Sequence, residues 1–178
     1  HKIPISILSN RFGNIGRKIW LMAQGLDYDM LKLDNKPPKS FGHGKVTIPG
    51  LKDKYLVKKV FRHMCEKVAK RMRINKFESN KFLIGYKTWN GWNMKKFHLH
   101  RFTNNGFDIY RLAENLIDEV DFKIGINQVQ VTAINPKPVN LQTDIFASTE
   151  ISHKHQIDSA VDKINLKYLD TTIGPARL

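Results

Sequence analysis

The stretch KFLIGYKTWNGWNMKKFHLHRF, residues 81–102, decides the fold. Two runs within it carry large apolar side chains at every second position: Phe82, Ile84, Tyr86, Phe97 and Leu99. That two-residue period is typical of strands with one buried face. Asn90-Gly91, which separates the runs, is a preferred pair for a tight hairpin turn. The stretch therefore predicts an antiparallel hairpin with one apolar face and one cationic or polar face.

The sequence on either side of the hairpin alternates between strand and helix patterns. Residues 53–74 and 106–120 carry apolar side chains at helical spacing. Residues 40–49 read as a strand closed by a Pro49-Gly50 turn, and residues 126–134 alternate polar with apolar side chains. The resulting order, strand-helix-strand-strand-helix-strand, is the ferredoxin-like βαββαβ order. We therefore expect an α+β fold: a four-stranded antiparallel or mixed sheet with two helices on one face.

A short helical unit is predicted ahead of this fold, over residues 6–26. Gly13 and Gly16 form a turn just before a helical stretch, and Arg11 and Arg17 lie beside it. A glycine turn that leads into a helix exposes backbone N–H groups suited to a phosphate. The segment alone leaves a second interpretation open, an ordinary helix–turn–helix corner.

Two further segments complete the chain. Pro37-Pro38 stops any helix and makes residues 27–39 an extended linker. Apolar spacing predicts a last helix over residues 152–168.

Composition narrows the class of protein. The chain has 178 residues, of which 41% are hydrophobic, so it can form a core and is not wholly disordered. No apolar run reaches the ~20 residues that span a bilayer. The one cysteine, Cys65, lies on an apolar helical stripe and is expected to be a core residue, and no internal disulfide is possible. These features favour a soluble intracellular protein.

The net charge of +14 is concentrated in the middle of the chain. Residues 36–101 carry eighteen basic and three acidic side chains, whereas residues 102–178 carry seven basic and ten acidic ones. Such polarisation is the electrostatic footprint of a protein that binds a polyanion.

The cationic hairpin is the sharpest candidate for that binding. Its basic side chains are Lys81, Lys87, Lys95, Lys96, His98, His100 and Arg101. An open, cationic sheet can lie along a phosphate backbone. The alternative is a solvated hairpin in which Trp89 and Trp92 anchor the core or a dimer.

Catalytic and metal-binding motifs are missing from the sequence. It contains no nucleotide-binding loop, nucleophile elbow or zinc-protease motif. Asp27 and Asp29 read as solvated loop acids, although they could ligate a metal. His98 and His100 share a strand face, but zinc would need further ligands nearby. We therefore expect no metal site and no catalytic residues.

Three segments together resemble a known family. They are RFGNIGRKIWLMAQGLD (11–27), PPKSFGHGKVTIP (37–49) and YKTWNGW (86–92). They resemble Y-family DNA polymerases, specifically the ImpB/MucB/SamB (UmuC-like) branch of bacterial translesion enzymes, over nearly the whole chain. The resemblance implies a C-terminal fragment with four parts: the end of the thumb (1–33), a linker (34–40), the little finger domain (41–140), and a clamp-binding motif with a helical tail (141–178).

The resemblance also implies which residues contact DNA. Main-chain N–H groups and polar side chains of one segment would contact the template backbone: Lys39, Ser40, Gly42, His43, Gly44, Lys45 and Thr47. The hairpin would lie along major-groove phosphates through Lys87, Thr88, Lys95, Lys96, His98, His100 and Arg101. The thumb turn would sit near the minor groove through Arg11, Gly13, Gly16 and Arg17.

The family's catalytic palm holds two Mg²⁺ ions, and nothing here matches it. The fragment is therefore expected to hold primer–template or damaged DNA without polymerising it, and to need no cofactor of its own. The implied setting is translesion synthesis and DNA repair in the SOS response, in the bacterial cytoplasm at the nucleoid. No membrane or small-molecule substrate is expected.

A short motif follows the last strand. QTDIF, residues 142–146, resembles the Q-x-x-[LI]-F peptide that docks bacterial polymerases on the sliding clamp. Gln142 would fix the register by hydrogen bonds, and Ile145 and Phe146 would insert as apolar anchors. The two apolar residues could instead belong to the core of the tail.

Two interpretations from other classes stay open at this point. One is a stand-alone RNA- or DNA-binding module with the same βαββαβ order. The other is a protein-interaction module whose partners are acidic.

Overall fold

The hairpin that the sequence predicts is the longest feature of the sheet. In the computed structural model, which describes residues 3–27, 36–139, 149–168 and 172–174, β2 (Phe77–Thr88) pairs antiparallel with β3 (Gly91–Thr103). Phe82 lies opposite Phe97, and Thr88 opposite Gly91. Gly91 has φ +122, a conformation that L side chains rarely adopt, which explains why the turn needs glycine there.

The chain divides into two units, residues 1–37 and residues 38–178. The division falls within the segment predicted as a linker.

The first unit contains α1 (Ile5–Ala23), which is interrupted at Gly13 with φ 59 and ψ −138. Residues 5–12 and 14–23 therefore form two arms of a corner. A Cβ atom on the buried Gly16 would collide with the backbone of Leu8, so the arms approach closely only because residue 16 is glycine. The Trp20 indole donates a hydrogen bond to the Ile3 carbonyl at 2.8 Å. The helix–turn–helix corner is confirmed, and its phosphate contact stays a prediction.

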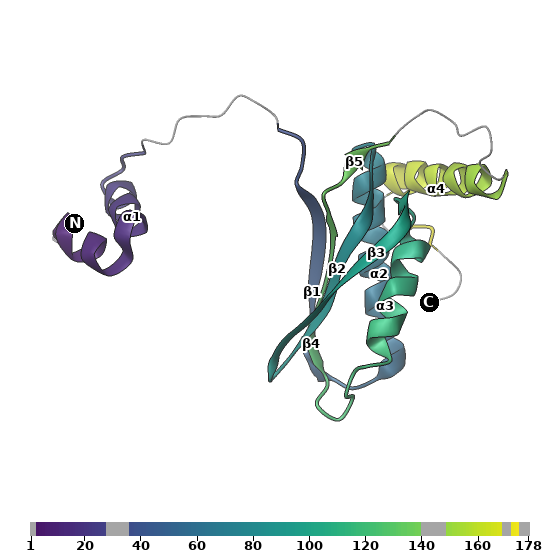
Figure 1. Ribbon diagram of the computed structural model, residues 1–178, viewed down its shortest axis with the longest axis horizontal. Coiled ribbons are helices and arrows are strands. Elements are labelled where there is room, and N and C mark those ends of the chain that lie inside the picture. Colours follow the sequence, from purple (N-terminus) through teal and green to yellow (C-terminus); the bar gives the residue numbers. More distant parts are fainter. Residues whose placement is uncertain (1–2, 28–35, 140–148, 169–171, 175–178) are drawn as a thin grey trace. The chain divides into compact units, whose positions relative to one another are not determined.

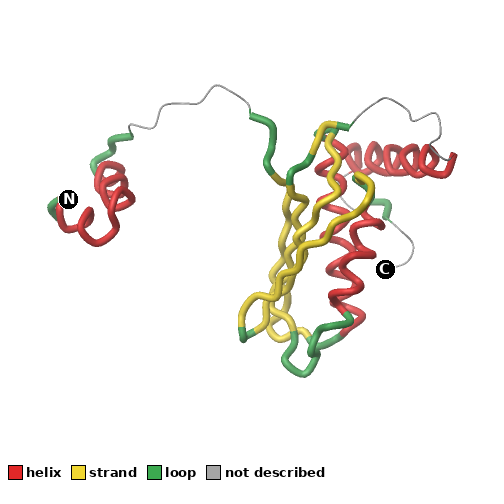
Figure 2. The backbone as a smooth tube through the Cα atoms, in the orientation of Figure 1, coloured by secondary structure: helices red, strands yellow, loops and turns green. Residues whose placement is uncertain are grey.

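The second unit follows the predicted order, as Figures 1 and 2 show. Its elements are β1 (Ser40–Leu51), α2 (Lys54–Ile74), β2, β3, α3 (Gly106–Ile117), β4 (Ile126–Ile134), β5 (Lys137–Pro138) and α4 (Thr149–Tyr168). The strands lie in the order β1-β4-β2-β3, all antiparallel, and the short β5 pairs with β2. The α+β fold is therefore confirmed, with one short strand more than predicted.

One local prediction was wrong. Pro49-Gly50 does not close β1, because the strand continues to Leu51. The register with β4 instead shifts between Val46 and Leu51, and Gly50 has φ +70. The two residues therefore form an irregularity within the strand.

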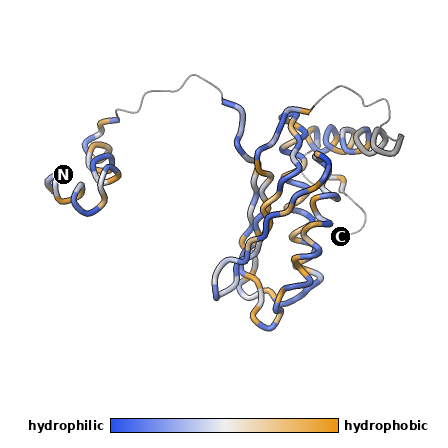
Figure 3. Tube along the Cα trace, viewed as in Figure 1, coloured by the Kyte–Doolittle hydropathy of each residue, from blue (hydrophilic) through white to orange (hydrophobic). Residues whose placement is uncertain are grey.

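The core lies between the sheet and the helices α2 and α3, which cover one face (Figure 1). Each helix begins at a side-chain cap: Asp53 accepts from the Tyr55 amide at 2.8 Å, and Asn105 from the Phe107 amide at 2.9 Å. Side chains with no exposed surface include Phe61, Val68, Phe82, Ile84, Ile109, Val129 and Val131. The alternation of hydrophobic and hydrophilic residues along the strands can be followed in Figure 3.

The structure tests two core positions that the sequence suggested, those of Cys65 and Trp89. Cys65 is fully buried, and burial raises the pKa of its thiol, which leaves it unreactive. Trp89 is 71% exposed at the hairpin tip, so the alternative in which it anchors the core does not hold.

A buried arginine attaches α4 to the rest of the second unit. The Arg73 guanidinium on α2 binds Asp162 of α4 at 2.6 Å and Glu66 at 2.7 Å. It also donates to the Asn104 carbonyl at 3.0 Å. Burial disfavours charge on Arg73, but its hydrogen bonds to Asp162 and Glu66 outweigh burial and raise its pKa.

We expect Arg73→Met to destabilise the chain by about 3–5 kcal/mol, because it leaves Glu66 and Asp162 as a cluster of like charges without a cation. Urea unfolding followed by circular dichroism measures this. Arg71→Met is the matched control on the same helix, since Arg71 is exposed and should cost less than about 1 kcal/mol. Equal unfolding midpoints for the two variants would contradict the role given to Arg73.

Asp158 makes the docking of α4 depend on pH. Burial raises the pKa of its carboxyl, and the nearby Arg73 offsets this only in part. The charged form is therefore disfavoured in the folded state, and this penalty disappears as the pH falls through the raised pKa. We expect Asp158→Asn to stabilise the chain at pH 7, with a gain that shrinks towards pH 4. Urea unfolding across that range checks it, and a gain that grows on acidification would refute it.

Candidate nucleic-acid interface

The face of the sheet that α2 and α3 leave uncovered is built from four rows of residues that lie opposite one another. In strand order β1-β4-β2-β3, the rows are Ser40–Ile134–Lys81–His98, Gly42–Thr132–Leu83–Lys96, Gly44–Gln130–Gly85–Met94 and Val46–Gln128–Lys87–Trp92. We call these sixteen residues the open face. The residues that alternate with them on the same strands point to the helix side of the sheet, because successive side chains in a strand point to opposite sides.

The open face is cationic. Its ionisable residues are Lys81, Lys87, Lys96 and His98, all exposed, and none of the sixteen is acidic. The His98 ring nitrogen lies 3.0 Å from the Asn80 amide nitrogen. His100 follows on the same side of β3 by alternation. This face can therefore attract a polyanion without any carboxylate to repel it.

The open face is nearly flat at its centre. Gly44 and Gly85 flank Gln130 in one row, and a Cβ atom at Gly85 would collide with Met94. The Gln130 amide donates to the Thr132 hydroxyl at 3.1 Å, so the central polar groups form a connected pair. The side chains of Gln130 and Met94 therefore lie over Gly44 and Gly85, which leaves the middle of the open face level.

One edge of the sheet adds main-chain donors. Among the strands of the described residues β1 pairs with β4 alone, so one of its sides carries no neighbouring strand from this part of the chain. The Lys39 carbonyl accepts from the Asn135 amide at 3.1 Å, which places the hydrogen-bonding groups of Lys39 on the β4 side. By alternation the amides of Ser40, Gly42 and Gly44 point away from β4. This is the kind of main-chain donor that the family resemblance expects here.

The structure divides the other predicted DNA contacts between two sides of the sheet. Lys87, Lys96 and His98 lie on the open side, and His100 follows His98 there by alternation. Lys95 lies on the helix side and binds Glu119 at 2.7 Å, and Arg101 binds Asp108 at 3.1 Å. Within β3 the two groups alternate, so charge counting alone could not separate them.

Three more predicted contacts lie away from the open face. Thr88 is 6% exposed, and its hydroxyl accepts from the Asn90 amide at 3.2 Å in the hairpin turn. His43 and Lys45 lie on the helix side of β1, opposite Val131 and Val129. Burial lowers the pKa of the His43 imidazole, and the cations Lys67 and Arg71 lower it further.

The remaining predicted contacts are Thr47, the thumb residues and the clamp motif. The Thr47 hydroxyl donates to the Ile126 carbonyl at 2.8 Å, so it holds β1 to β4. Arg11 and Arg17 are exposed on α1, and the Arg11 guanidinium lies 5.5 Å from the Phe12 ring centre. Gln142, Ile145 and Phe146 lie outside the described residues.

Three polar residues of β4 were not among the predicted contacts: Gln128, Gln130 and Thr132. They form the central column of the open face between β1 and β2. Their alternation with Val129, Val131 and Ala133 is visible in the sequence and could have identified them.

Within the part of the chain that the structure describes, no three histidine, cysteine or acidic side chains come together as a group that could hold a metal ion. The same described residues include no helix with the length and apolar character required to cross a bilayer.

Comparison with known proteins agrees with this architecture. A model of the impB/mucB/samB family C-terminal domain matches residues 38–144. DNA polymerase IV of Moorella thermoacetica (strain ATCC 39073 / JCM 9320) is 28% identical over 187 residues. That alignment covers 97% of this chain and 44% of the relative, so the chain spans less than half of that protein's length. Because the family match covers more than half of the chain and coincides with the βαββαβ unit, the protein belongs to the impB/mucB/samB family of Y-family DNA polymerases and contains its C-terminal domain.

Proposed function

We propose that this chain is the DNA-holding part of a translesion DNA polymerase and grips primer–template DNA through the open face. The observation that carries the proposal is the open face itself, where three lysines and a histidine occur among sixteen residues without one acid. Phosphates carry no sequence information, so such a surface holds DNA of any sequence. A flat, shallow surface also accommodates a template distorted by damage.

The edge amides extend this surface. Amides of Ser40, Gly42 and Gly44 point outward from β1 and lie next to the glycine-rich middle of the open face. An amide is a neutral donor, so it positions a phosphate without adding to the salt dependence of binding, whereas lysines supply the ionic part. Lysines and amides together would set both affinity and register on the duplex.

Polymerisation belongs, in this proposal, to the parent protein. The palm residues and the two Mg²⁺ ions that transfer nucleotides have no counterpart among the 178 residues. The fragment's task is to position DNA, in damage tolerance and repair. Its expected location is the bacterial cytoplasm.

We expect duplex binding to weaken steeply as the salt concentration rises. Lys87→Ala and Lys96→Ala should each reduce the slope of log K against log salt by about one, because each lysine releases one counterion when it contacts a phosphate. Fluorescence anisotropy with a labelled primer–template across a salt series measures this. Two duplexes of unrelated sequence should bind equally.

Lys95→Ala is the matched control. It removes the same charge from the adjacent position, but Lys95 lies on the helix side with Glu119. Its salt slope should equal that of the parent chain. Equal effects of the Lys95 and Lys96 variants, or no duplex binding at low salt, would reject the open face as the DNA surface.

The proposal includes docking on the bacterial sliding clamp through Gln142, Ile145 and Phe146. Its support is the QTDIF sequence directly after the domain. Apolar anchors in a pocket dominate such contacts, so Phe146→Ala should weaken clamp binding at least about tenfold. Surface plasmon resonance with immobilised clamp measures it. Thr143→Ala, at a variable position of the same motif, is the control, and equal losses for both variants would rule out the motif.

A further inference from the structure

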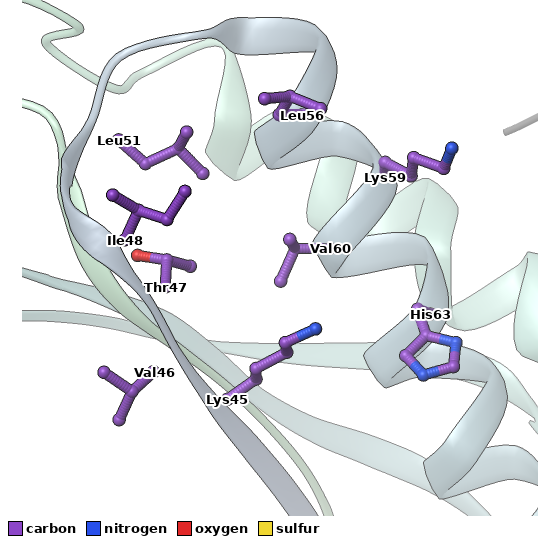
Figure 4. A pocket seen from close by; sticks show the side chains of 9 residues that line it. All are labelled: Lys45, Val46, Thr47, Ile48, Leu51, Leu56, Lys59, Val60 and His63. Atoms are coloured by element: carbon purple, nitrogen blue, oxygen red, sulfur yellow. The ribbon is translucent and has the colours of Figure 1, made fainter.

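A groove of about 440 Å³ lies between the edge strand β1 and helix α2 and shares one residue, Val46, with the open face (Figure 4). Its lining residues come from these two elements alone: Lys45, Val46, Thr47, Ile48, Leu51, Leu56, Lys59, Val60 and His63. A volume of this size is typical of cavities that accept small ligands or a few side chains.

The groove combines an apolar wall with a cationic rim. Leu51, Leu56 and Val60 lie around it, while Lys45 extends from the strand towards the helix and Lys59 extends outward from the helix (Figure 4). Ile48 is 76% exposed, which is unusual for an isoleucine. A ligand that fits must therefore offer aliphatic groups and negative charge together.

Positive charge continues beyond the groove, along the line where β1 packs against α2, which we call the seam. Lys67 and Arg71 lie close enough to His43 to lower the pKa of its imidazole. The Arg71 guanidinium donates to the Gly42 carbonyl at 2.7 Å. β1 and α2 together contain one acidic residue, Glu66, whose carboxylate binds Arg73. The seam therefore offers an acidic ligand several cations and no competing carboxylate along these two elements.

The residues that line the groove favour a peptide over a nucleic acid as its ligand. No phenylalanine, tyrosine or tryptophan lines the groove, and His63 at one end is the single ring among the described lining residues, so the groove has no extended platform on which bases could stack. Aliphatic walls suit leucine, isoleucine or valine side chains instead. Addition of a strand to β1 is disfavoured, because Pro49 and the irregular register lie at this part of the edge. The groove therefore takes side chains of a ligand.

We propose that the β1–α2 groove binds an acidic segment of a partner protein, in which aliphatic side chains fill the groove and flanking carboxylates pair with Lys45 and Lys59. None of the open-face cations Lys81, Lys87, Lys96 and His98 lines the groove, so the inference does not depend on their DNA contacts. A chain could hold DNA and such a segment at the same time.

The test uses a fluorescein-labelled synthetic peptide of sequence EDLLEEIDD with the full chain at 0.15 M salt. Lys45→Ala and Lys59→Ala should each weaken binding about threefold to fivefold, as expected for a partly exposed ion pair. Leu56→Ser should weaken it at least as much by removing apolar contact. Lys123→Ala and Lys96→Ala, both exposed and away from the groove, should leave the affinity unchanged.

Two further probes keep the outcome unambiguous. A peptide with its three aliphatic residues replaced by serine should bind at least about tenfold more weakly, since the groove recognises more than charge. A single-stranded oligonucleotide should not displace the peptide. Equal binding of the serine peptide, displacement by the oligonucleotide, or equal losses for Lys96→Ala and Lys59→Ala would each overturn the proposal. The duplex-binding assay with the open-face variants reports separately on the proposed function.

Discussion

The two-residue period of β4 is the constraint on which the second unit depends. β4 pairs with β1 on one side and β2 on the other, so its register sets which side chains of both neighbours face the helices. Val129 and Val131 are fully buried, and each is worth about 1.5–3 kcal/mol relative to exposure. A slip of one residue would place Gln128 and Gln130 under the helices instead. The core therefore holds the register, and the open face follows from it.

The same constraint explains how far the sequence predicts the site. Alternation in residues 81–102 predicts both the hairpin and its cationic side, because period and turn chemistry are local properties. The separation of Lys95 from Lys96 also follows from alternation. The acids that pair with Lys95 and Arg101 do not, since Glu119 and Asp108 come from other parts of the chain.

Tertiary contacts account for what sequence reasoning missed. Arg73 is one of eight basic residues of α2, and the sequence around it does not distinguish it from the other seven. Only the packing of α4 against α2 shows that it is buried among carboxylates. Trp89 shows the reverse case, because the sequence leaves open whether this aromatic side chain packs in the core, and the fold leaves it exposed. The groove is likewise invisible in the sequence, since its two walls come from β1 and α2 and exist only where these elements pack together.

The cations of α2 and those of the open face lie on the two sides of one sheet, and this arrangement couples the surfaces electrostatically. Like charges four residues apart on a helix cost about 0.2–0.5 kcal/mol a pair, and Lys67 and Arg71 have that spacing. An anion on either side relieves part of this repulsion, so it lowers the attraction left for a second anion. At physiological ionic strength the Debye length is about 8 Å, comparable to the roughly 10 Å distance between packed layers. The coupling is therefore negative, weak in the cell and stronger at low salt, which lets the two surfaces act nearly independently under physiological conditions.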